Sequence, residues 1–176
     1  ASSSFGFNTG GADVYGISSA GLANAWHHIA AVFYNGDSTQ SLLYVDGVQQ
    51  SLSLRTGSIV NANAVATTNA LISGWPNDAG YRFTGQLDEL RIWSGTRSQS
   101  QIQASMNSTT VGPATGLLAA YNFDSIATGA GGVTDVSGNG RNGTLSGLTM
   151  SNVVATNWNQ TSLTITENTA TNTVIG

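Results

Sequence analysis

Short apolar runs alternate with clusters of Gly, Asn, Asp and Ser along most of the chain. Two runs rich in β-branched and aromatic residues, 27–34 and 41–45, flank the polar segment 35–40. This pattern predicts two strands joined by a turn-rich loop. Asp46 and Gly47 tolerate positive φ, so a second tight turn is expected directly after the second strand.

Similar patterns elsewhere predict an all-β antiparallel sandwich with one short helix. The expected strands are 3–7, 14–17, 27–34, 41–45, 70–75, 82–84 with 87–93, 116–123 and 143–150. The helix is expected over 98–107, where Ser98 can act as the N-cap and Gln101 completes a capping box. Ile102 and Met106 lie four residues apart and would share its inward face.

The composition narrows the classes of partner. Charged residues make up only 8% of the chain, and the net charge is −4 with no basic cluster. Because a nucleic-acid-binding surface needs such a cluster, the composition argues against a nucleic-acid partner. No apolar run approaches the length of a membrane span. The chain has no cysteine, which excludes disulfides and thiolate metal sites.

Three sequence blocks follow one another in order. They are WHHIA (26–30) with LYVDG (43–47), FTGQLDELRIW (83–93), and GLLAAYNFD (116–124) with DVSGNGRNGTL (135–145). With these blocks the chain resembles the laminin-G-like jelly-roll domains of the concanavalin A-like lectin/glucanase superfamily. The resemblance implies a jelly-roll domain over 1–158 in a bacterial protein located outside the cell or at the cell surface.

The resemblance also bears on how the sandwich is completed. Relatives carry further strands before the first block. Either this chain is part of a longer domain, or its sandwich is completed from elsewhere, because an incomplete sandwich would have open sheet edges, which pair readily with another strand. The alternating segment 162–167 in the C-terminal tail, 159–176, is a candidate strand. It resembles the start of a following cadherin-like repeat. The alternative is a strand donated to a neighbouring subunit, with self-association through the open edges.

Aromatic residues in one predicted loop suggest a ligand site. Trp75 and Tyr81 lie at the two ends of the loop 75–81, and aromatic faces can pack against the C–H surfaces of sugar rings. Asn77 and Arg82 would add polar contacts. The expected partner is therefore a glycan or another cell-surface ligand, and carbohydrate is the expected class of ligand.

Segment 135–140 suggests a cation site, because oxygen-bearing side chains alternate before a glycine, as in the first half of a calcium loop. Ser146 stands where such a loop needs a glutamate, so a glycine-rich turn is the alternative. The resemblance implies a calcium ion held by an acid of the second block, either Asp88 or Glu89. The candidate calcium ligands are Asp88, Asp124, Asp135 and Asn139, provided that folding brings them together.

The paired histidines have two interpretations. His27 and His28 begin a predicted core strand, where they would act as metal ligands or a general base, or would pack and hydrogen-bond at the strand start. Packing is favoured, because only one of the two can face inward. Trp26 and Trp93 lie within strand patterns and are expected in the core.

The acidic residues argue against catalysis. Strand alternation places Glu89 on the face of Leu87 and Asp88 on the face of Leu90. Glycoside-cleaving relatives need carboxylates at alternate positions on one face. The acid spacing therefore predicts a non-catalytic protein, and the resemblance implies an adhesion or ligand-binding module outside the cell. The alternative is a structural subunit of a surface filament or layer that assembles by strand donation.

Overall fold

Antiparallel β-strands dominate the chain, as its sequence pattern predicts. The computed structural model describes residues 3–8, 14–61, 70–72, 83, 85–109, 112–123, 126–127, 132–144, 153–154 and 161–165. Within these residues every strand pair is antiparallel, and α1 (Gln99–Ser105) is the single α-helix. The expected class, an all-β sandwich with one short helix, is confirmed. The chain divides into unit 1, Ala1–Ala66 with Thr96–Ser108, and unit 2, Thr67–Gly95 with Thr109–Gly176.

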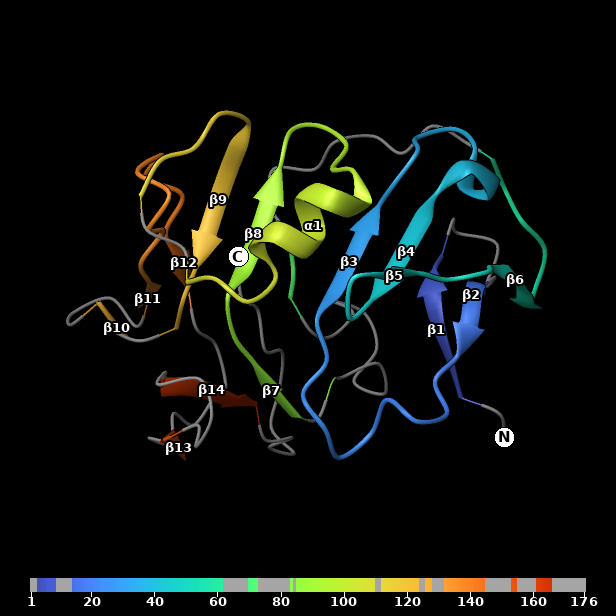
Figure 1. Ribbon diagram of the computed structural model, residues 1–176, viewed down its shortest axis with the longest axis horizontal. Helices are drawn as coiled ribbons and strands as arrows, with labels where there is room; N and C mark the ends of the chain where they lie inside the picture. The colour runs from blue at the N-terminus through green and yellow to red at the C-terminus, as the bar shows by residue number, and fades with distance from the viewer. Residues whose placement is uncertain are drawn as a thin grey trace. The chain divides into compact units, whose positions relative to one another are not determined.

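Unit 1 contains two three-stranded sheets (Figure 1). β1 (Ser4–Phe7), β2 (Val14–Ser18) and β6 (Ser53–Thr56) form the first, in the order β1-β2-β6. β3 (Ile29–Val32), β4 (Leu42–Val45) and β5 (Val48–Gln49) form the second, in the order β3-β4-β5. The rings of Phe7 in β1 and Phe33 next to β3 lie with their centroids 6.1 Å apart, so the two sheets contact each other through aromatic side chains.

The hairpin predicted at the first sequence block is present. β3 and β4 pair with Ile29 opposite Val45, and the loop between them contains the 3-10 helix η1 (Ser38–Gln40). Asp46 and Gly47 connect β4 to β5 with φ values of 51° and 74°. Because a two-residue turn of this kind needs positive φ at both positions, the predicted tight turn is confirmed.

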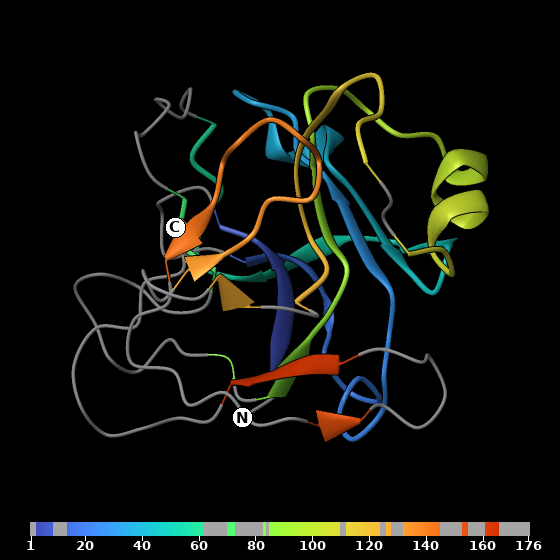
Figure 2. The same cartoon turned by 90° about the vertical axis from the view of Figure 1, so that its left-hand side faces the viewer.

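Helix α1 begins with the predicted capping box. The Ser98 hydroxyl accepts a hydrogen bond from the backbone N–H of Gln101, and the Gln101 side chain accepts one from the N–H of Ser98. Ile102 is buried and packs against Val32 and Tyr44. The helix therefore covers one face of the β3-β4 hairpin, as Figure 2 shows.

Two glutamine side chains fix α1 to the β4-β5 turn. The Nε2 atoms of Gln99 and Gln103, four residues apart on the helix, each donate to the carbonyl oxygen of Gly47 at 2.9 Å. A Cβ at position 47 would lie 2.8 Å from Cγ of Gln103 and 3.0 Å from Sδ of Met106. The turn therefore needs glycine both for its φ and for the close approach of the helix.

Unit 2 contains three further sheets in its described part. Their strands are β7 (Gly85–Leu87), β8 (Leu90–Trp93), β9 (Leu117–Tyr121), β10 (Ile126–Ala127), β11 (Gly132–Val133), β12 (Gly143–Thr144), β13 (Val153–Val154) and β14 (Thr161–Ile165). The strand orders are β8-β9, β10-β11-β12 and β13-β14-β7. β14 pairs with β7 in a register that sets Leu163 opposite Leu87. The candidate strand of the tail thus pairs within its own chain.

The core of unit 2 shows where the expected alternation fails. Leu87 and Leu90 both pack against one buried cluster, which consists of Ala119, Tyr121, Phe123 and Val133. Between them Glu89 has a φ of 50°, a left-handed conformation. The prediction that Leu87 and Leu90 face opposite sides was therefore wrong, because one left-handed residue between β7 and β8 shifts the alternation by one position.

Several expected strands differ in extent. The strand expected over 27–34 is shorter, because the N–H of His28 donates to the side chain of Asp46 instead of extending the ladder with β4. Residues 70–72 of the expected strand 70–75 are described and are not part of a strand. β5, β6, β10, β11 and β13 were not expected from the sequence. All but β6 have only two residues, which are too few for a period-two pattern to be recognised.

Candidate functional site

Only some of the predicted site residues lie within the described part of the structure. The four residues predicted to contact a sugar lie outside it, as does one predicted calcium ligand; these are Trp75, Asn77, Tyr81, Arg82 and Asp124. Their roles stay predictions. The described part contains three groups of polar side chains that bear on function: the loop 135–142, the segment 88–91, and the turn at Asp46 with its neighbouring histidines.

Asp135 anchors the loop between β11 and β12 to strand β9. Its carboxylate accepts hydrogen bonds from the backbone N–H groups of Ala120 (3.0 Å), Ser137 (2.9 Å) and Arg141 (2.9 Å). Its own backbone N–H donates to the side-chain oxygen of Asn142 at 3.0 Å. Since Asp135 is buried, these bonds replace the water that a carboxylate otherwise binds.

The pKa of Asp135 follows from this environment. Burial raises the pKa, but hydrogen bonds from the Ser137 side chain and from the N–H groups of Ala120, Arg141 and Ser137 lower it by more, to about 2. The carboxylate is therefore ionised at neutral pH. It holds the loop as a charged acceptor, and charged acceptors form stronger hydrogen bonds than neutral ones.

Asn139 and Arg141 bind the same loop to β9. The Nδ2 atom of Asn139 donates to the carbonyl oxygens of Leu117 (2.8 Å) and Leu118 (3.1 Å). Nη1 of Arg141 donates to Leu118 at 2.7 Å, and the Tyr121 hydroxyl donates to the Arg141 carbonyl at 2.6 Å. The loop 135–142 of the third sequence block is thus a polar turn that is hydrogen-bonded to β9 through both backbone and side chains.

These bonds bear on the predicted calcium site. Both carboxylate oxygens of Asp135 point to backbone N–H groups, and Asn139 directs its amide nitrogen, which is not a cation ligand, toward β9. Across the described ranges, no three His, Asp or Glu side chains gather into a group that could hold a metal ion. The contacts of the loop fit the alternative interpretation, a glycine-rich turn. Calcium binding stays a prediction.

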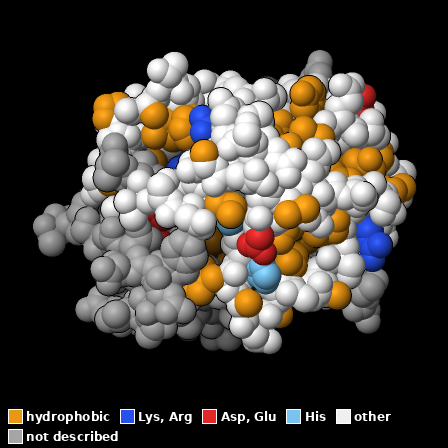
Figure 3. Space-filling view, in the orientation of Figure 1, with side chains coloured by type: hydrophobic (Ala, Val, Ile, Leu, Met, Phe, Trp, Pro, Cys, Tyr) orange, Lys and Arg blue, Asp and Glu red, His pale blue; other side chains and the backbone are white. Residues whose placement is uncertain are grey.

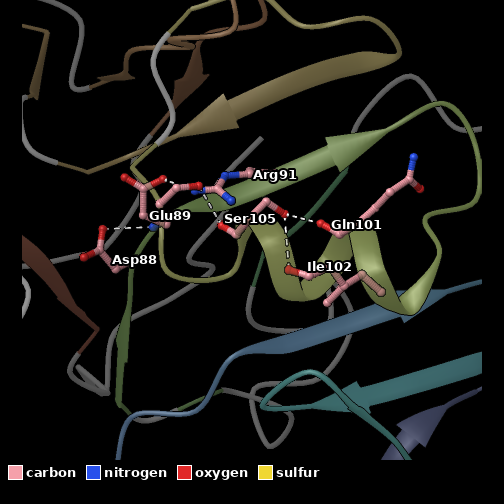
Figure 4. A network of polar contacts seen from close by, with 7 residues as sticks. Asp88, Glu89, Arg91, Gln101, Ile102 and Ser105 are labelled. Atoms are coloured by element: carbon pink, nitrogen blue, oxygen red, sulfur yellow. Dashed lines mark hydrogen bonds and ion pairs between the residues drawn. The ribbon is translucent and has the colours of Figure 1, made fainter.

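Asp88, the remaining described calcium candidate, lies in the link between β7 and β8 (Figure 4). Its Oδ1 accepts a hydrogen bond from the N–H of Glu89 at 2.9 Å. Oε2 of Glu89 lies 2.8 Å from Nη2 of Arg91, and both side chains are largely buried. Glu89, in the link between β7 and β8, thus forms an ion pair with Arg91 of β8, which supports a structural role for it.

The turn residue Asp46 organises the paired histidines of the first block. Its Oδ2 lies 2.8 Å from Nδ1 of His27, and its Oδ1 accepts from the N–H of His28 at 2.9 Å. Its own N–H donates to the His28 carbonyl at 2.8 Å. These contacts support the hydrogen-bonding role at the strand start. The sequence pattern marked Asp46 only as a turn residue, and its side-chain role was missed.

This cluster reaches the surface. Burial raises the pKa of Asp46, but the hydrogen bonds and charges of His27 and His28 lower it by more, so the pKa lies below its usual value. Trp26, the residue before His27, is 45% exposed. The prediction that Trp26 belongs to the core was wrong, because β3 begins only at Ile29 and Trp26 precedes the core-facing positions.

The described surface carries few charges. In Figure 3 uncharged polar and hydrophobic side chains cover most of the described face, and an acidic side chain adjoins a histidine near its centre. Exposed aromatic residues of unit 1 are Phe5, Trp26, Phe33 and Tyr34. As for the membrane, the described residues include no helix that is long and apolar enough to span it.

Comparisons with known proteins bear on the family. No curated protein and no solved structure matches the chain significantly. A laminin G family model, described as the concanavalin A-like lectin/glucanases superfamily, matches residues 2–103. This segment contains the first two sequence blocks, both sheets of unit 1 and most of α1. Since the match extends over more than half of its length, the chain belongs to the concanavalin A-like lectin/glucanases superfamily.

Proposed function

We propose that the protein is a non-catalytic extracellular module that binds carbohydrate. Membership of the superfamily supports a carbohydrate-binding or adhesion-type module. The observation that carries the non-catalytic part is that the described acids serve the protein's own structure: Asp46 holds His27, Glu89 pairs with Arg91, and Asp135 holds β9. A glycosidase instead needs two carboxylates that face one sugar ring.

The composition of the chain supports a neutral sugar as ligand. Sugar sites combine aromatic faces with a few hydrogen-bonding groups, and the chain is rich in hydroxyl and amide side chains but poor in charge. A strongly anionic ligand would need basic residues in a cluster. A glycan on a cell surface is therefore the proposed partner, with Trp75, Asn77, Tyr81 and Arg82 as proposed contacts.

A glycan array tests this proposal. The purified chain is applied to immobilised neutral and anionic glycans, and saturable binding to neutral glycans is expected. Trp75→Ala and Tyr81→Ala should weaken that binding if the predicted loop carries the ligand. An array with no saturable binding would contradict the proposal.

Incubation with the glycans that bind tests the non-catalytic part. No new reducing ends should form over long incubation. Turnover that disappears in Glu89→Gln or Asp88→Asn would show an enzyme instead.

The pairing of β14 with β7 favours a binding module over a subunit that assembles by strand donation. Leu163, Thr164 and Ile165 pair with β7 in the same chain, so this sheet edge is occupied without a second copy. Light scattering at several protein concentrations separates the two functions. A constant monomer mass supports the binding module. A mass that grows with concentration supports strand donation, provided that this growth disappears when the chain is truncated at residue 160.

Calcium would act as a stabilising ion in this proposal. Thermal unfolding with calcium and with excess chelator measures its effect, because a ligand that binds only the folded state raises the midpoint. An unchanged midpoint would remove calcium from the proposal and leave the carbohydrate-binding part intact.

A further inference from the structure

We propose that Trp26 and Asp46, at the start of the β3-β4 hairpin, form a contact site for a neutral pyranose ring that presents two adjacent hydroxyl groups. The inference deepens the proposed function and rests on it, since it names a site for the same class of ligand. It involves none of the residues that the sequence pattern marked for sugar binding.

Asp46 supplies a fixed and accessible carboxylate. Its two oxygens are held at 2.8 Å from Nδ1 of His27 and at 2.9 Å from the backbone nitrogen of His28, while 51% of the side chain is exposed. An ionised carboxylate offers about four acceptor positions, and the bonds within the described residues use two of them. The other positions are available to a pair of neighbouring hydroxyl groups.

His27 is a positioning residue for this carboxylate. Its Nε2 is buried and has no hydrogen-bond partner within the described part of the chain. An ionised carboxylate can only accept hydrogen bonds, so Nδ1 of His27 is the donor in its 2.8 Å contact with Oδ2 of Asp46. The carboxylate is therefore oriented before a ligand arrives, which reduces the entropic cost of binding.

Trp26 supplies the apolar surface of the site. It directly precedes His27, the residue that the carboxylate contacts, and almost half of it is exposed. The exposed part of an indole contributes no hydrophobic stabilisation to the fold. A ligand that covers this part gains the free energy of removing it from water. Figure 3 shows an acidic side chain and a histidine side by side at the surface with hydrophobic side chains next to them.

The chemistry of the two groups selects the class of sugar. The C–H face of a pyranose packs on the indole, and two adjacent hydroxyls donate to the carboxylate. The lowered pKa of Asp46 keeps that carboxylate ionised at neutral pH. Sialylated or sulfated rings are repelled by its charge, so the site should accept neutral sugars and reject anionic ones.

Nuclear magnetic resonance of the four tryptophan indoles tests the site directly. Trp26→Phe assigns the Trp26 indole N–H signal by its loss from the spectrum. The ¹⁵N-labelled protein is then titrated with the methyl glycosides of glucose, galactose, mannose and N-acetylglucosamine. A saturable shift of the Trp26 signal by at least one of these sugars is expected.

Two isosteric variants give the matched comparison. Asp46→Asn removes the charged acceptor and should weaken the affinity about tenfold, the effect of losing a hydrogen bond to a charged group. Asp37→Asn serves as control, because Asp37 also has a pKa below its usual value and caps η1 in the same unit but does not contact the histidines. Its affinity should equal that of the unsubstituted chain.

The outcomes separate the site from the function. A saturable shift confined to the other three indoles, with equal affinity in Asp46→Asn and Trp26→Ala, overturns this site and leaves the proposed function standing. Absence of binding by every glycoside and by the glycan array overturns both. Loss of affinity in Asp46→Asn and Trp26→Ala, but not in Asp37→Asn, supports the site.

Discussion

Asp135 and Ala120, fifteen residues apart, are linked by a hydrogen bond, and a second hydrogen bond joins Ala120 to Val136. The N–H of Ala120 donates to Oδ1 of Asp135 at 3.0 Å, and the Ala120 carbonyl accepts from the N–H of Val136 at 2.8 Å. The loop that begins at Asp135 is therefore attached to β9 as a further strand would be, with a side chain in place of one backbone partner.

Removal of this carboxylate should destabilise the protein. Asp135→Ala leaves the N–H groups of Ala120, Ser137 and Arg141 without their acceptor in a buried loop, and unsatisfied buried donors cost about 1–3 kcal/mol each unless water reaches them. We expect a loss of about 2–4 kcal/mol in the free energy of unfolding, measured by urea denaturation. Thr134→Ala, at the exposed neighbouring position, is the control and should cost less than about 0.5 kcal/mol.

Acid should weaken the fold through the same group. The pKa of Asp135 is about 2 in the folded state and 3.8 for the free side chain, so its contribution is complete above about pH 5 and is lost as the pH falls toward 2. A shift of this size corresponds to roughly 2 kcal/mol. The stability difference between the unsubstituted chain and Asp135→Asn should therefore shrink between pH 5 and pH 2. A constant difference over this range would contradict the assignment.

Asn139→Asp distinguishes a structural turn from a calcium loop. The carboxylate would face the carbonyl oxygens of Leu117 and Leu118, to which the amide nitrogen now donates. We expect a loss of about 1–3 kcal/mol, whether or not calcium is present. If Asn139 instead ligates calcium, the added charge should raise the calcium-dependent shift of the melting temperature.

The capping box should contribute measurably to the attachment of α1. Ser98→Ala removes the acceptor for the N–H of Gln101 and is expected to cost about 1 kcal/mol in the free energy of unfolding. Thr96→Ala, exposed before the helix, controls for loss of a hydroxyl. An equal effect of both substitutions would show that the cap does not stabilise the helix.

Gly6 and Gly16 face each other across β1 and β2, and neither leaves room for a side chain. A Cβ on Gly6 would lie 2.6 Å from Cα of Gly16, which is backbone and cannot move aside as a flexible side chain does. Gly6→Ala should therefore lower the free energy of unfolding by about 1–3 kcal/mol. Gly95→Ala, where a Cβ meets nothing within 4 Å, should be close to neutral.

The sequence predicted the elements whose signals are local. Ser98 and Gln101 stand three residues apart as a capping box requires, and Asp46 and Gly47 supply the positive φ of a two-residue turn. Each of these features depends on neighbours within a few residues. The hairpin, the helix and the all-β class were therefore predictable before any tertiary contact was known.

The site was predictable only in part, for a physical reason. Asp135 and Asn139 were recognised as a pair in one loop, but which of their atoms face β9 depends on contacts with residues about twenty positions away. Asp46 was recognised as a turn residue, while its bonds to His27 and His28 arise only when β3 and β4 pair.

The amino-acid sequence by itself determined the antiparallel all-β class, the β3-β4 hairpin and the helix start, because periodicity, turn residues and caps act within a few positions along the chain. Only the tertiary structure decided that Glu89 takes a left-handed conformation, which brings Leu87 and Leu90 to one core. It also decided that Trp26 is exposed beside the residue that Asp46 holds. Both outcomes depend on which distant segments pair with a strand, because that pairing decides which residues are buried and which side chains contact one another.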